Sequence, residues 1–592
     1  MNVSTSLRVR LPVLVLVLEV VIMVLYFFFV TYDDNANARL QNNETNPMEN
    51  SMYRDYPYFA DVQVMIFIGF GCLLAFFRFY GFSGMVFNFL TATFSIQWAI
   101  LIQGFFQFYY NGQIHLGVIN LLNAEFACAV VLISFGAVLG KTSPVQLLVM
   151  ALLEIPVFAV TEWAVLKYIR INDAGGSILI HLFACYFGLG VTFVLFRPSL
   201  NNGHPKETTS YHSDILSVMG TLFLWVFWPS FNSALTLKGD DQHRAVLHTF
   251  IGLTSSTMTA FALSAVFNKR GKLTMADIQN VTLAGGVTVG ASVDMMISPV
   301  AAYALGIMGC TACFLGYRYL TPFLAQRLRI QDQCGIHNLH GITGLISSTA
   351  GICAILLANE ETYGPSMYQI FSHRAPPAGD PKLLELQRLI PGLKPGLGRT
   401  AQEQALYQVA AIFSTIAAAA VGGLLTGLVL KLPCMASPAD EDCFDDEVFF
   451  DMPSDFESVF HKIPVNCEEK GLHMNTINSS RSCSHSETAE AAEERRTGKR
   501  LRAGGGRGGR APIVLCTANV GKQEHGYRRL TQADRVETLF CGRTTSTVSP
   551  RQKKNLLVDS TSGAAESVNA SSAPSSLTAC EVTHHRVCVC SL

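Results

Sequence analysis

The chain has 592 residues, 50% of them apolar and 15% charged, with 43 basic and 44 acidic side chains and a formal net charge of −1. Soluble globular chains carry about 25% charged residues. The apolar content excludes a wholly disordered protein, and the balanced charge offers no basic excess for binding nucleic acid. This composition is typical of a polytopic helical membrane protein, because each crossing of a bilayer needs about 20 apolar residues.

The first apolar run covers Leu11 to Val30 and follows Arg8 and Arg10. It is longer than the apolar region of a secretory signal, which has about 7 to 15 residues, so we interpret it as a retained helix. Further apolar runs predict eleven more spans, for about twelve in an all-α fold: 61–80, 85–107, 115–139, 144–166, 174–196, 214–236, 244–267, 275–297, 299–320, 336–357 and 405–430.

An even number of spans puts both termini on one side of the membrane. Lysine and arginine in the short loops favour cytoplasmic termini, although the positive charges of the long loop 358–404 weaken this bias. The loops 31–60 and 358–404 are then external. Asn43 begins an Asn-Glu-Thr sequon in the first of them, which predicts a glycosylation site on the outer side.

The composition changes after the last predicted span. The sequence therefore predicts a membrane domain over residues 1–432 and a cytosolic tail over 433–592. The tail is acidic to about Pro453, and beyond it a serine-, glycine- and arginine-rich sequence predicts disorder. The Arg-Gly stretch near 500–510 is open to two interpretations, a solvated tail or a contact with RNA or anionic lipid.

Cysteines do not indicate a disulfide framework or a metal site. All 16 lie within apolar runs, beside one, or from Cys434 onward, and none falls in either long external loop. Cys310 and Cys313 form a C-x-x-C spacing inside an apolar run without a second pair, so we expect neither a metal nor a redox role. We expect no cofactor.

Two of the predicted spans contain an aspartate and a histidine at the same spacing. Asp173 is followed eight residues later by His181, and Asp332 is followed eight residues later by His340, with both members displaced by 159 positions (332 − 173 and 340 − 181). The two spans begin at opposite faces of the membrane, which is the pattern of an inverted repeat. Eight residues advance a helix by about 12 Å, so we expect both imidazoles near the midplane of the bilayer.

Buried polar groups in a membrane are costly and are functional candidates. A neutral imidazole both donates and accepts hydrogen bonds, so two of them can bind each other and still offer a polar edge to a small solute. The alternative is a satisfied polar pair without a transport role. For Asp173 and Asp332 the leading interpretation is structural, since a carboxylate at a helix N-terminus accepts backbone N–H bonds.

These two Asp/His segments, together with four further segments of the chain, resemble the Rh glycoproteins of the ammonium transporter and Rh family. The resemblance extends over about residues 7–453, and the loop around Asn43 is most similar to the non-erythroid type B and C members. The segments that carry it are the two Asp/His segments together with Phe135–Pro144, Trp225–Ala234, Gln279–Gly286 and Asp442–Glu447.

The resemblance implies roles for particular residues. Two stacked phenylalanines at the outer entrance fall on Phe126 and Phe231, whose alternative interpretation is core packing. An apolar constriction would pass a small neutral solute and hold back a hydrated ion. Glu162 would enrich cations at the outer mouth, or would be a solvated acid at a helix end. The family's pore histidines fall on His181 and His340, its outer buried aspartate on Asp173, and the inner counterpart on Asp332.

The resemblance also implies a mechanism and partners. Ammonium would be recruited at the mouth and ammonia conducted past the histidines, in a homotrimer in which each subunit of the plasma-membrane protein has its own pore. Methylammonium and carbon dioxide are further candidate solutes, membrane lipid surrounds the protein, and the tail would bind a cytoskeletal or trafficking partner. No nucleic acid is expected.

Two rival functions stay open. One is a proton-coupled transporter of another small solute, which would share the inverted repeat and the buried titratable groups. The other is a structural membrane partner, although a pure scaffold has no need of two polar groups in the bilayer centre. We expect no enzymatic activity, because the sequence has no nucleophile triad, phosphate loop or metal cluster.

Overall fold

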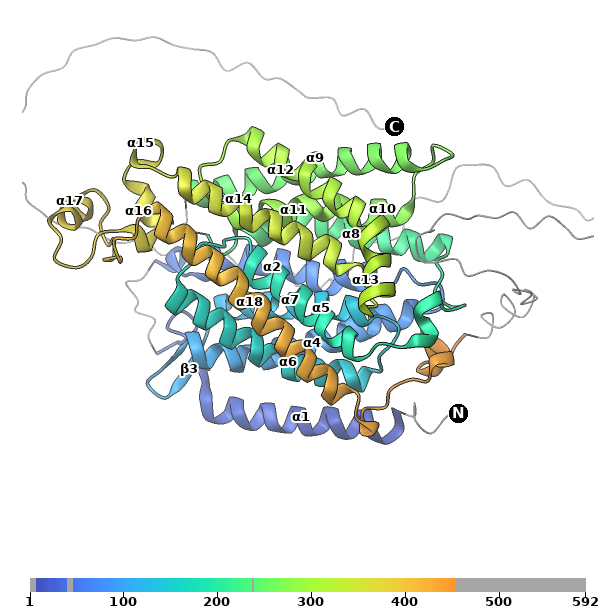
Figure 1. The fold of residues 1–592 in the computed structure, drawn as a ribbon. Helices are drawn as coiled ribbons and strands as arrows, with labels where there is room; N and C mark the ends of the chain where they lie inside the picture. Colours follow the sequence, from blue (N-terminus) through green and yellow to red (C-terminus); the bar gives the residue numbers. More distant parts are fainter. Residues whose placement is uncertain (1–6, 40–45, 237–238, 454–592) are drawn as a thin grey trace, which may run out of the picture. The chain divides into compact units, whose positions relative to one another are not determined.

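The computed structural model describes residues 7–39, 46–236 and 239–453 (Figure 1). All of the described residues belong to one compact unit of the chain. The predicted glycosylation site Asn43 and the predicted disordered tail from 454 onward lie outside the described residues.

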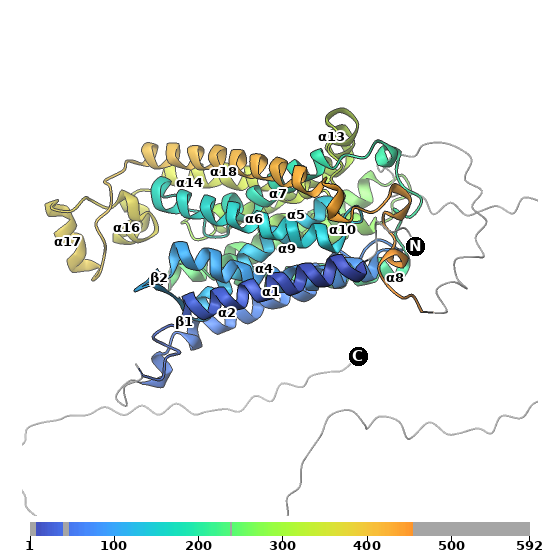
Figure 2. The same cartoon turned by 90° about the horizontal axis from the view of Figure 1, so that it is seen from below.

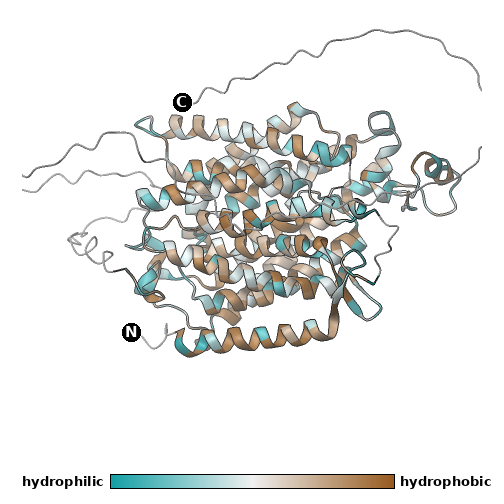
Figure 3. Ribbon diagram, turned by 180° about the vertical axis from the view of Figure 1, so that it is seen from behind, coloured by the Kyte–Doolittle hydropathy of each residue, from teal (hydrophilic) through white to brown (hydrophobic). Residues whose placement is uncertain are grey.

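The described part of the chain is a helical bundle, which confirms the predicted all-α polytopic class. Eleven of its helices are long and apolar enough to cross a membrane (Figure 3). The α-helices are α1 (Leu7–Phe29), α2 (Met52–Val64), α3 (Phe70–Leu73), α4 (Gly81–Gln107), α5 (Val118–Val138), α6 (Pro144–Ala164), α7 (Phe183–Val194), α8 (Tyr211–Ser233), α9 (Asp240–Phe267), α10 (Met275–Asn280), α11 (Ala284–Val289), α12 (Pro299–Leu315), α13 (Thr321–Leu328), α14 (Thr343–Leu357), α15 (Glu360–Tyr363), α16 (Met367–Ile370), α17 (Pro381–Leu389) and α18 (Ala401–Leu430).

Short π-helical segments, in which the hydrogen bonds run from i to i+5, continue several of these helices. They matter here because π segments in helices are often found at functional sites. They are Met65–Gly69 between α2 and α3, Val165–Ile169 after α6, Ser177–Leu182 before α7, Gly316–Leu320 between α12 and α13, and His337–Ile342 before α14.

The span predicted over 275–297 is not one helix. It is broken into α10, a 3-10 turn Val281–Leu283, α11 and a second 3-10 turn Gly290–Ser292. Glycines let neighbouring groups approach this segment closely: a Cβ on Gly285 would lie 2.1 Å from the Gly252 carbonyl oxygen. Close backbone packing from α9 therefore accompanies the interruption, and hydropathy alone, which averages over the segment, does not reveal it.

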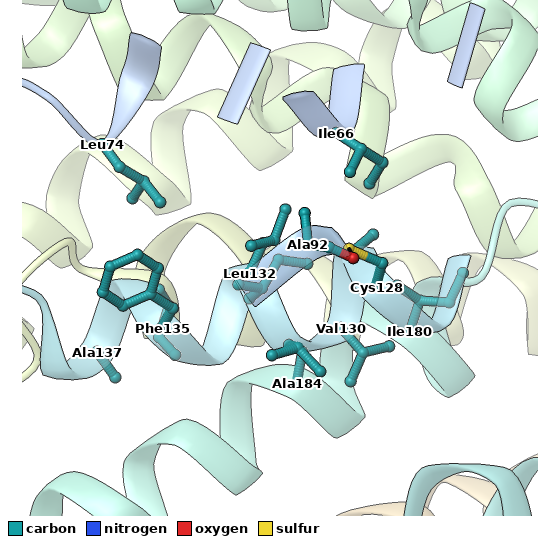
Figure 4. Close-up of a cluster of buried hydrophobic side chains, with 14 of the residues drawn as sticks. Ile66, Leu74, Ala92, Cys128, Val130, Leu132, Phe135, Ala137, Ile180 and Ala184 are labelled. Carbon is teal, nitrogen blue, oxygen red and sulfur yellow. Dashed lines mark hydrogen bonds between the residues drawn. The ribbon is translucent and has the colours of Figure 1, made fainter. Parts of the chain in front are cut away.

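Helix α5 lies at the centre of the bundle. In its apolar window, 89% of the residues are buried, against 6% for α1. Figure 4 shows part of its surroundings, where Phe135 and Cys128 of α5 lie among Ile66, Ala92 and Ala184 from other elements. Helix α1 instead runs along the flank of the bundle beside α4 and exposes an apolar surface suited to lipid (Figure 2).

A small three-stranded sheet lies at one end of the bundle. It contains β1 (Val30–Tyr32), β2 (Tyr109–Tyr110) and β3 (Gln113–Leu116) in the order β1-β3-β2, with β1 parallel and β2 antiparallel to β3. The sheet therefore ties the end of α1 to the connection between α4 and α5. These connections lie on the side that the sequence predicts to be external.

The loop 358–404 has a small core of its own. Phe371, Leu383 and Leu386 are buried there and cluster with Met295 and Ala405. The loop also holds the backbone that leads to Asp173, because the Arg399 guanidinium donates to the Ile169 carbonyl oxygen at 2.8 Å and the Asn172 side chain donates to the Ile370 carbonyl oxygen. This loop is thus folded and packs against the segment that precedes Asp173.

The first part of the predicted tail packs on the start of α4 and on the connection between α5 and α6. The Phe444 ring fills the space beside Gly140, where a Cβ would lie 2.2 Å from the ring. The Asp446 carboxylate accepts hydrogen bonds from the backbone N–H groups of Phe82 and Ser83, at 2.9 and 2.7 Å. These are orphan donors in the first turn of α4, so a distant segment caps this helix.

Candidate functional site

The two histidines singled out by the sequence repeat lie against each other. The Nδ1 atoms of His181 and His340 are 3.1 Å apart, and the ring centroids are 5.1 Å apart with an interplanar angle of 13°. Both side chains are buried, at 2% and 6% exposure. Two segments 159 residues apart therefore meet at one point in the bundle.

Each histidine is carried by a π-helical segment that follows a left-handed glycine. Gly176 and Gly335 both have φ of +69°, a value that favours glycine. The backbone N–H of His181 donates to the Gly176 carbonyl oxygen at 3.0 Å, an i to i+5 bond. The same local construction thus presents both imidazoles, which is how a repeated sequence gives a paired site.

Asp173 and Asp332 bind backbone N–H groups at the start of these two segments. Asp173 Oδ2 accepts from the backbone N–H groups of Ile178 and Leu179, at 2.9 and 2.8 Å. Asp332 accepts in the same way from the two residues Ile336 and His337, at 3.0 and 2.9 Å. Each carboxylate satisfies orphan N–H donors, which is the structural role that the sequence favours.

The contact between the histidines constrains their protonation. In a hydrogen bond between two Nδ1 atoms, one ring donates and the other accepts, so two neutral rings have opposite tautomers. The ring that donates through Nδ1 has an accepting Nε2, and its partner has a donating Nε2. The Nε2 atom of His181 has no hydrogen-bond partner among the described residues, so it can bind a small polar solute.

An apolar pocket adjoins the histidines. The ring of Trp228 lies parallel to His181 with centroids 6.0 Å apart, and Phe231 lies at the same distance. Phe70 and Leu283 complete much of the lining. Apart from the two histidines, every side chain lining this pocket is uncharged and largely apolar, so a cation there would have no counterion in the lining.

A second pocket also adjoins His340. It shares Phe70 and Leu339 with the first pocket and adds Ile336, Cys334 and Asn280. Asn280 ends α10 at the break in the predicted span. His340 therefore lines both pockets, whereas His181 lines only the first of the two, and both linings are mainly apolar.

Phe126 and Phe231 are in contact, but they do not stack. Their ring centroids are 4.8 Å apart and their planes meet at 74°, an edge-to-face arrangement. The expectation of stacked rings was wrong in this respect, and the reason is physical: the positive edge of one ring is attracted to the negative face of the other. Both rings are nearly buried, at 3% and 5% exposure, and Phe231 lines the first pocket, whereas Phe126 lines neither pocket.

Glu162 is not brought to the histidine site and lines neither pocket. Its carboxylate accepts hydrogen bonds from the side-chain amides of Gln103 and Gln107, at 2.9 and 2.8 Å. It is therefore an acid paired with two glutamines near the C-terminal ends of α4 and α6, rather than a freely solvated one.

Sequence reasoning missed Trp228. This residue precedes Phe231 by three positions on α8, so both rings lie on one face of the helix and reach the pocket together. Its ring packs against Gly286, where a Cβ would lie 2.6 Å from the ring atom Cε2. The spacing of Trp and Phe on one helix was the available signal.

The site offers no metal centre. Within residues 7–39, 46–236 and 239–453, no group of three histidine, cysteine, aspartate or glutamate side chains could hold a metal ion. The chemistry of the site is therefore that of a hydrogen-bonded imidazole pair in apolar surroundings.

Known proteins share this sequence and architecture. The model of the Ammonium Transporter Family matches residues 21–449. The chain is 46% identical over 478 residues to "Ammonium transporter Rh type B" of Danio rerio, covering 80% of this chain and 100% of that protein. It is also 46% identical over 461 residues to "Ammonium transporter Rh type C" of Canis lupus familiaris, covering 77% and 96%.

A solved structure also has a fold similar to that of this chain. The structure described as "Nitrosomonas europaea Rh50 and mechanism of conduction by Rhesus protein family of channels" superimposes with a TM-score of 0.56 and 28% identity. The match covers 69% of this chain and 96% of that one. The protein is therefore a multi-pass membrane protein that belongs to the ammonium transporter family, within its Rh branch, and is not an enzyme.

Proposed function

We propose that this protein transports ammonium across the plasma membrane by conducting neutral ammonia past His181 and His340. The observation that carries the proposal is the contact between the two imidazoles, at 3.1 Å, beside two pockets with uncharged linings. The names of the relatives, ammonium transporters of Rh types B and C, support this choice of solute.

The apolar constriction at Phe126 and Phe231 selects against charge. A hydrated ammonium ion loses its water there, and the constriction offers no replacement ligands, whereas ammonia loses little. Ammonium therefore gives up its proton before or within the constriction. The edge-to-face pair, with both rings almost buried, requires ring movement to open a path.

The histidine pair then replaces part of the hydration of ammonia. A donating Nε2 on one ring and an accepting Nε2 on the other match a solute that both accepts and donates hydrogen bonds. His181 Nε2 is unpartnered among the described residues, and it belongs to a ring that lines the first pocket. Solute would pass from the first pocket to the second along this polar edge.

The acids around the site act indirectly in this proposal. Asp173 and Asp332 hold the two π-helical segments, and Glu162 contributes negative charge near the outer mouth. We further propose cytoplasmic termini, a glycan at Asn43, and a homotrimer in which every subunit contains its own pore. The folded loop 358–404 would then lie at the outer face of each subunit.

The proposal is tested by reconstituting the purified protein into liposomes and imposing an inward ammonium gradient. We expect rapid alkalinisation of the lumen, well above that of protein-free liposomes, and no requirement for an imposed proton gradient. A dependence on a proton gradient would favour a proton-coupled transporter. Rates equal to those of protein-free liposomes would favour a structural membrane partner.

A further inference from the structure

Glu154 is an acidic residue near the middle of α6 for which the proposed pathway has no use. It is fully buried, at 0% exposure, and it lines neither pocket. One of its oxygens, Oε1, is in a very short contact with the Ser134 hydroxyl of α5, and Oε2 has no partner among the described residues. A buried acid with a single hydroxyl neighbour raises the question of whether it carries a proton.

Counting hydrogens around Ser134 answers this question. The hydroxyl has one hydrogen to donate, and its oxygen lies 2.9 Å from the carbonyl oxygen of Ala184 on α7. A carbonyl oxygen can only accept, so the serine hydrogen points to Ala184. The contact with Glu154 is then a hydrogen bond only if the carboxyl group donates to the serine oxygen, which requires a protonated acid.

The neighbouring helices offer no counterion that would stabilise a carboxylate. Helices α4, α5 and α18 pack against α6, and α7 holds the Ala184 carbonyl; none of these five helices contains a lysine, arginine or histidine. Their titratable side chains are Glu125, Cys128, Glu162, Cys185, Tyr186, Glu403 and Tyr407, none of them a cation. The π-helical segment Val165–Ile169, which continues α6, contains Lys167, but this residue follows Glu154 by 13 positions (167 − 154) and its ammonium group lies over the Trp163 ring.

Helix α1 also contacts α6, but its basic residues lie at the start of α1, whereas Glu154 lies near the middle of α6. Arg8 and Arg10 lie in its first turn, whereas Glu154 lies ten residues after the start of α6. Its other charged residue, Glu19, is an acid and adds no positive charge. An unpaired carboxylate in dry protein is far costlier than a neutral acid.

We propose that Glu154 is held as a neutral carboxylic acid and that its hydrogen bond through Ser134 to Ala184 positions the segment that carries His181. The positioning role rests on the proposed function, whereas the protonation state does not. The chain of bonds runs from α6 through α5 to α7, and Ala184 follows His181 by three residues, less than one helical turn.

The packing of α5 against α7 supports the positioning role. At Gly188, a Cβ would lie 3.1 Å from Ser134 Cα and 3.2 Å from Ala137 Cβ, so the two helices touch closely one turn beyond Ala184. A change in the hydrogen bonds at Ser134 therefore acts where the separation of α5 and α7 is set. Helix α7 continues directly from the π-helical segment of His181.

Infrared spectroscopy of the purified full-length protein tests the protonation state. The wild type minus Glu154→Gln difference spectrum is expected to contain the carbonyl band of a protonated carboxylic acid, unchanged between pH 6 and pH 9. The matched control is Glu125→Gln, which alters another fully buried glutamate and should leave this band in place. A carboxylate band in the difference spectrum, or no band assignable to Glu154, would overturn the proposal.

Ammonia flux in proteoliposomes tests the positioning role. Glu154→Gln keeps a donor for Ser134, so its rate should equal that of the wild type. Glu154→Leu and Ser134→Ala should lower the rate by a factor of about 10 to 100, because a misplacement of about 1 Å can cost about a hundredfold at other sites. Ser134→Thr keeps the hydroxyl group and should transport at the wild-type rate. Equal rates in all variants, or a loss in Glu154→Gln, would contradict the role. A wild type no faster than empty liposomes would instead sink the proposed function, and the infrared result would still decide the protonation state.

Discussion

Single residues decide the character of the site because each is held by a specific neighbour. His181 meets His340 through their Nδ1 atoms, and Trp228 lies against His181 because Gly286 leaves room for its ring. The Asp/His spacing predicted the contact between His181 and His340, since both segments have the same local structure. The spacing of Trp228 and Phe231 on α8 indicates that the two rings share a face, but the space that Gly286 leaves for Trp228 was not predictable, because no repeated motif links these two residues, which lie 58 positions apart (286 − 228).

Gly286→Ala should move the Trp228 ring. The added Cβ would lie 2.6 Å from a ring atom in a buried setting, so we expect a loss of about 1 to 3 kcal/mol in the free energy of unfolding and a lower ammonia flux. Thermal unfolding in detergent and liposome flux measure the two effects. The matched control is Gly81→Ala, which meets no atom within 4 Å and should change neither. Equal behaviour of both variants would contradict this account.

Glu207 lies outside the spans, in the connection between α7 and α8. Burial raises its pKa to about 7 from 4.5, while its hydrogen bond from the His204 N–H and the nearby Lys141 act in the opposite direction. Between pH 4.5 and 7 the folded protein keeps a proton that the unfolded chain releases. Folding stability from this group is therefore fully present below pH 4.5 and is lost as pH rises toward 7.

Glu207→Gln should remove this pH dependence. Relative to the variant, the wild type should lose about 1 to 3 kcal/mol of stability between pH 4.5 and 8, because each pKa unit is worth about 1.4 kcal/mol. Thermal unfolding of both proteins at several pH values gives the comparison. Parallel pH profiles, or a wild type that gains stability as pH rises, would show that Glu207 does not titrate in this way.

The starts and breaks of helices depend on contacts with residues that are distant in the sequence. The start of α4 has no side-chain cap from its own residue Tyr80, and its free N–H groups bind Asp446 instead. The span predicted over 275–297 is broken, and its glycines admit α9 closely, although its run of apolar residues predicts a single helix. Runs of apolar residues thus predicted where helices lie, but not how they begin or break.

Asp446→Ala should weaken the start of α4 and release the segment after Pro433 from α4 and from the connection between α5 and α6. Loss of a cap costs about 0.5 to 2 kcal/mol, and the neighbouring contacts of Phe444 with Gly140 would loosen with it. Thermal unfolding and limited proteolysis near residue 440 measure these effects. The exposed Asp451 gives the matched control, and an Asp451→Ala protein equally sensitive to protease would argue against a specific cap.

At the scale of the whole molecule, the chain brings two copies of one construction to a shared centre from segments 159 residues apart. The repeat and the all-α class followed from sequence, because hydropathy and spacing are local properties. The edge-to-face geometry of Phe126 and Phe231 did not follow, since it depends on how α5 and α8 pack. Sidedness rests on loop charge and on one sequon.

Asn43 tests that sidedness. Treatment with an endoglycosidase should increase the gel mobility of the wild-type protein expressed in animal cells, and Asn43→Gln should abolish the shift. Asn280→Gln is the control, since Asn280 also begins a sequon but its side chain donates to the Ala276 carbonyl oxygen within α10. A shift that survives Asn43→Gln, or disappears in Asn280→Gln, would contradict the proposed topology.

The central claim is that neutral ammonia passes along the two imidazoles. It is tested most directly by stopped-flow measurement of lumenal pH in proteoliposomes with an imposed ammonium gradient and a collapsed membrane potential. The account predicts fast alkalinisation by the wild type and a much slower rate for His181→Ala/His340→Ala, with both proteins inserted equally. Equal rates for the two proteins, or a wild-type rate that vanishes when the potential is collapsed, would contradict it.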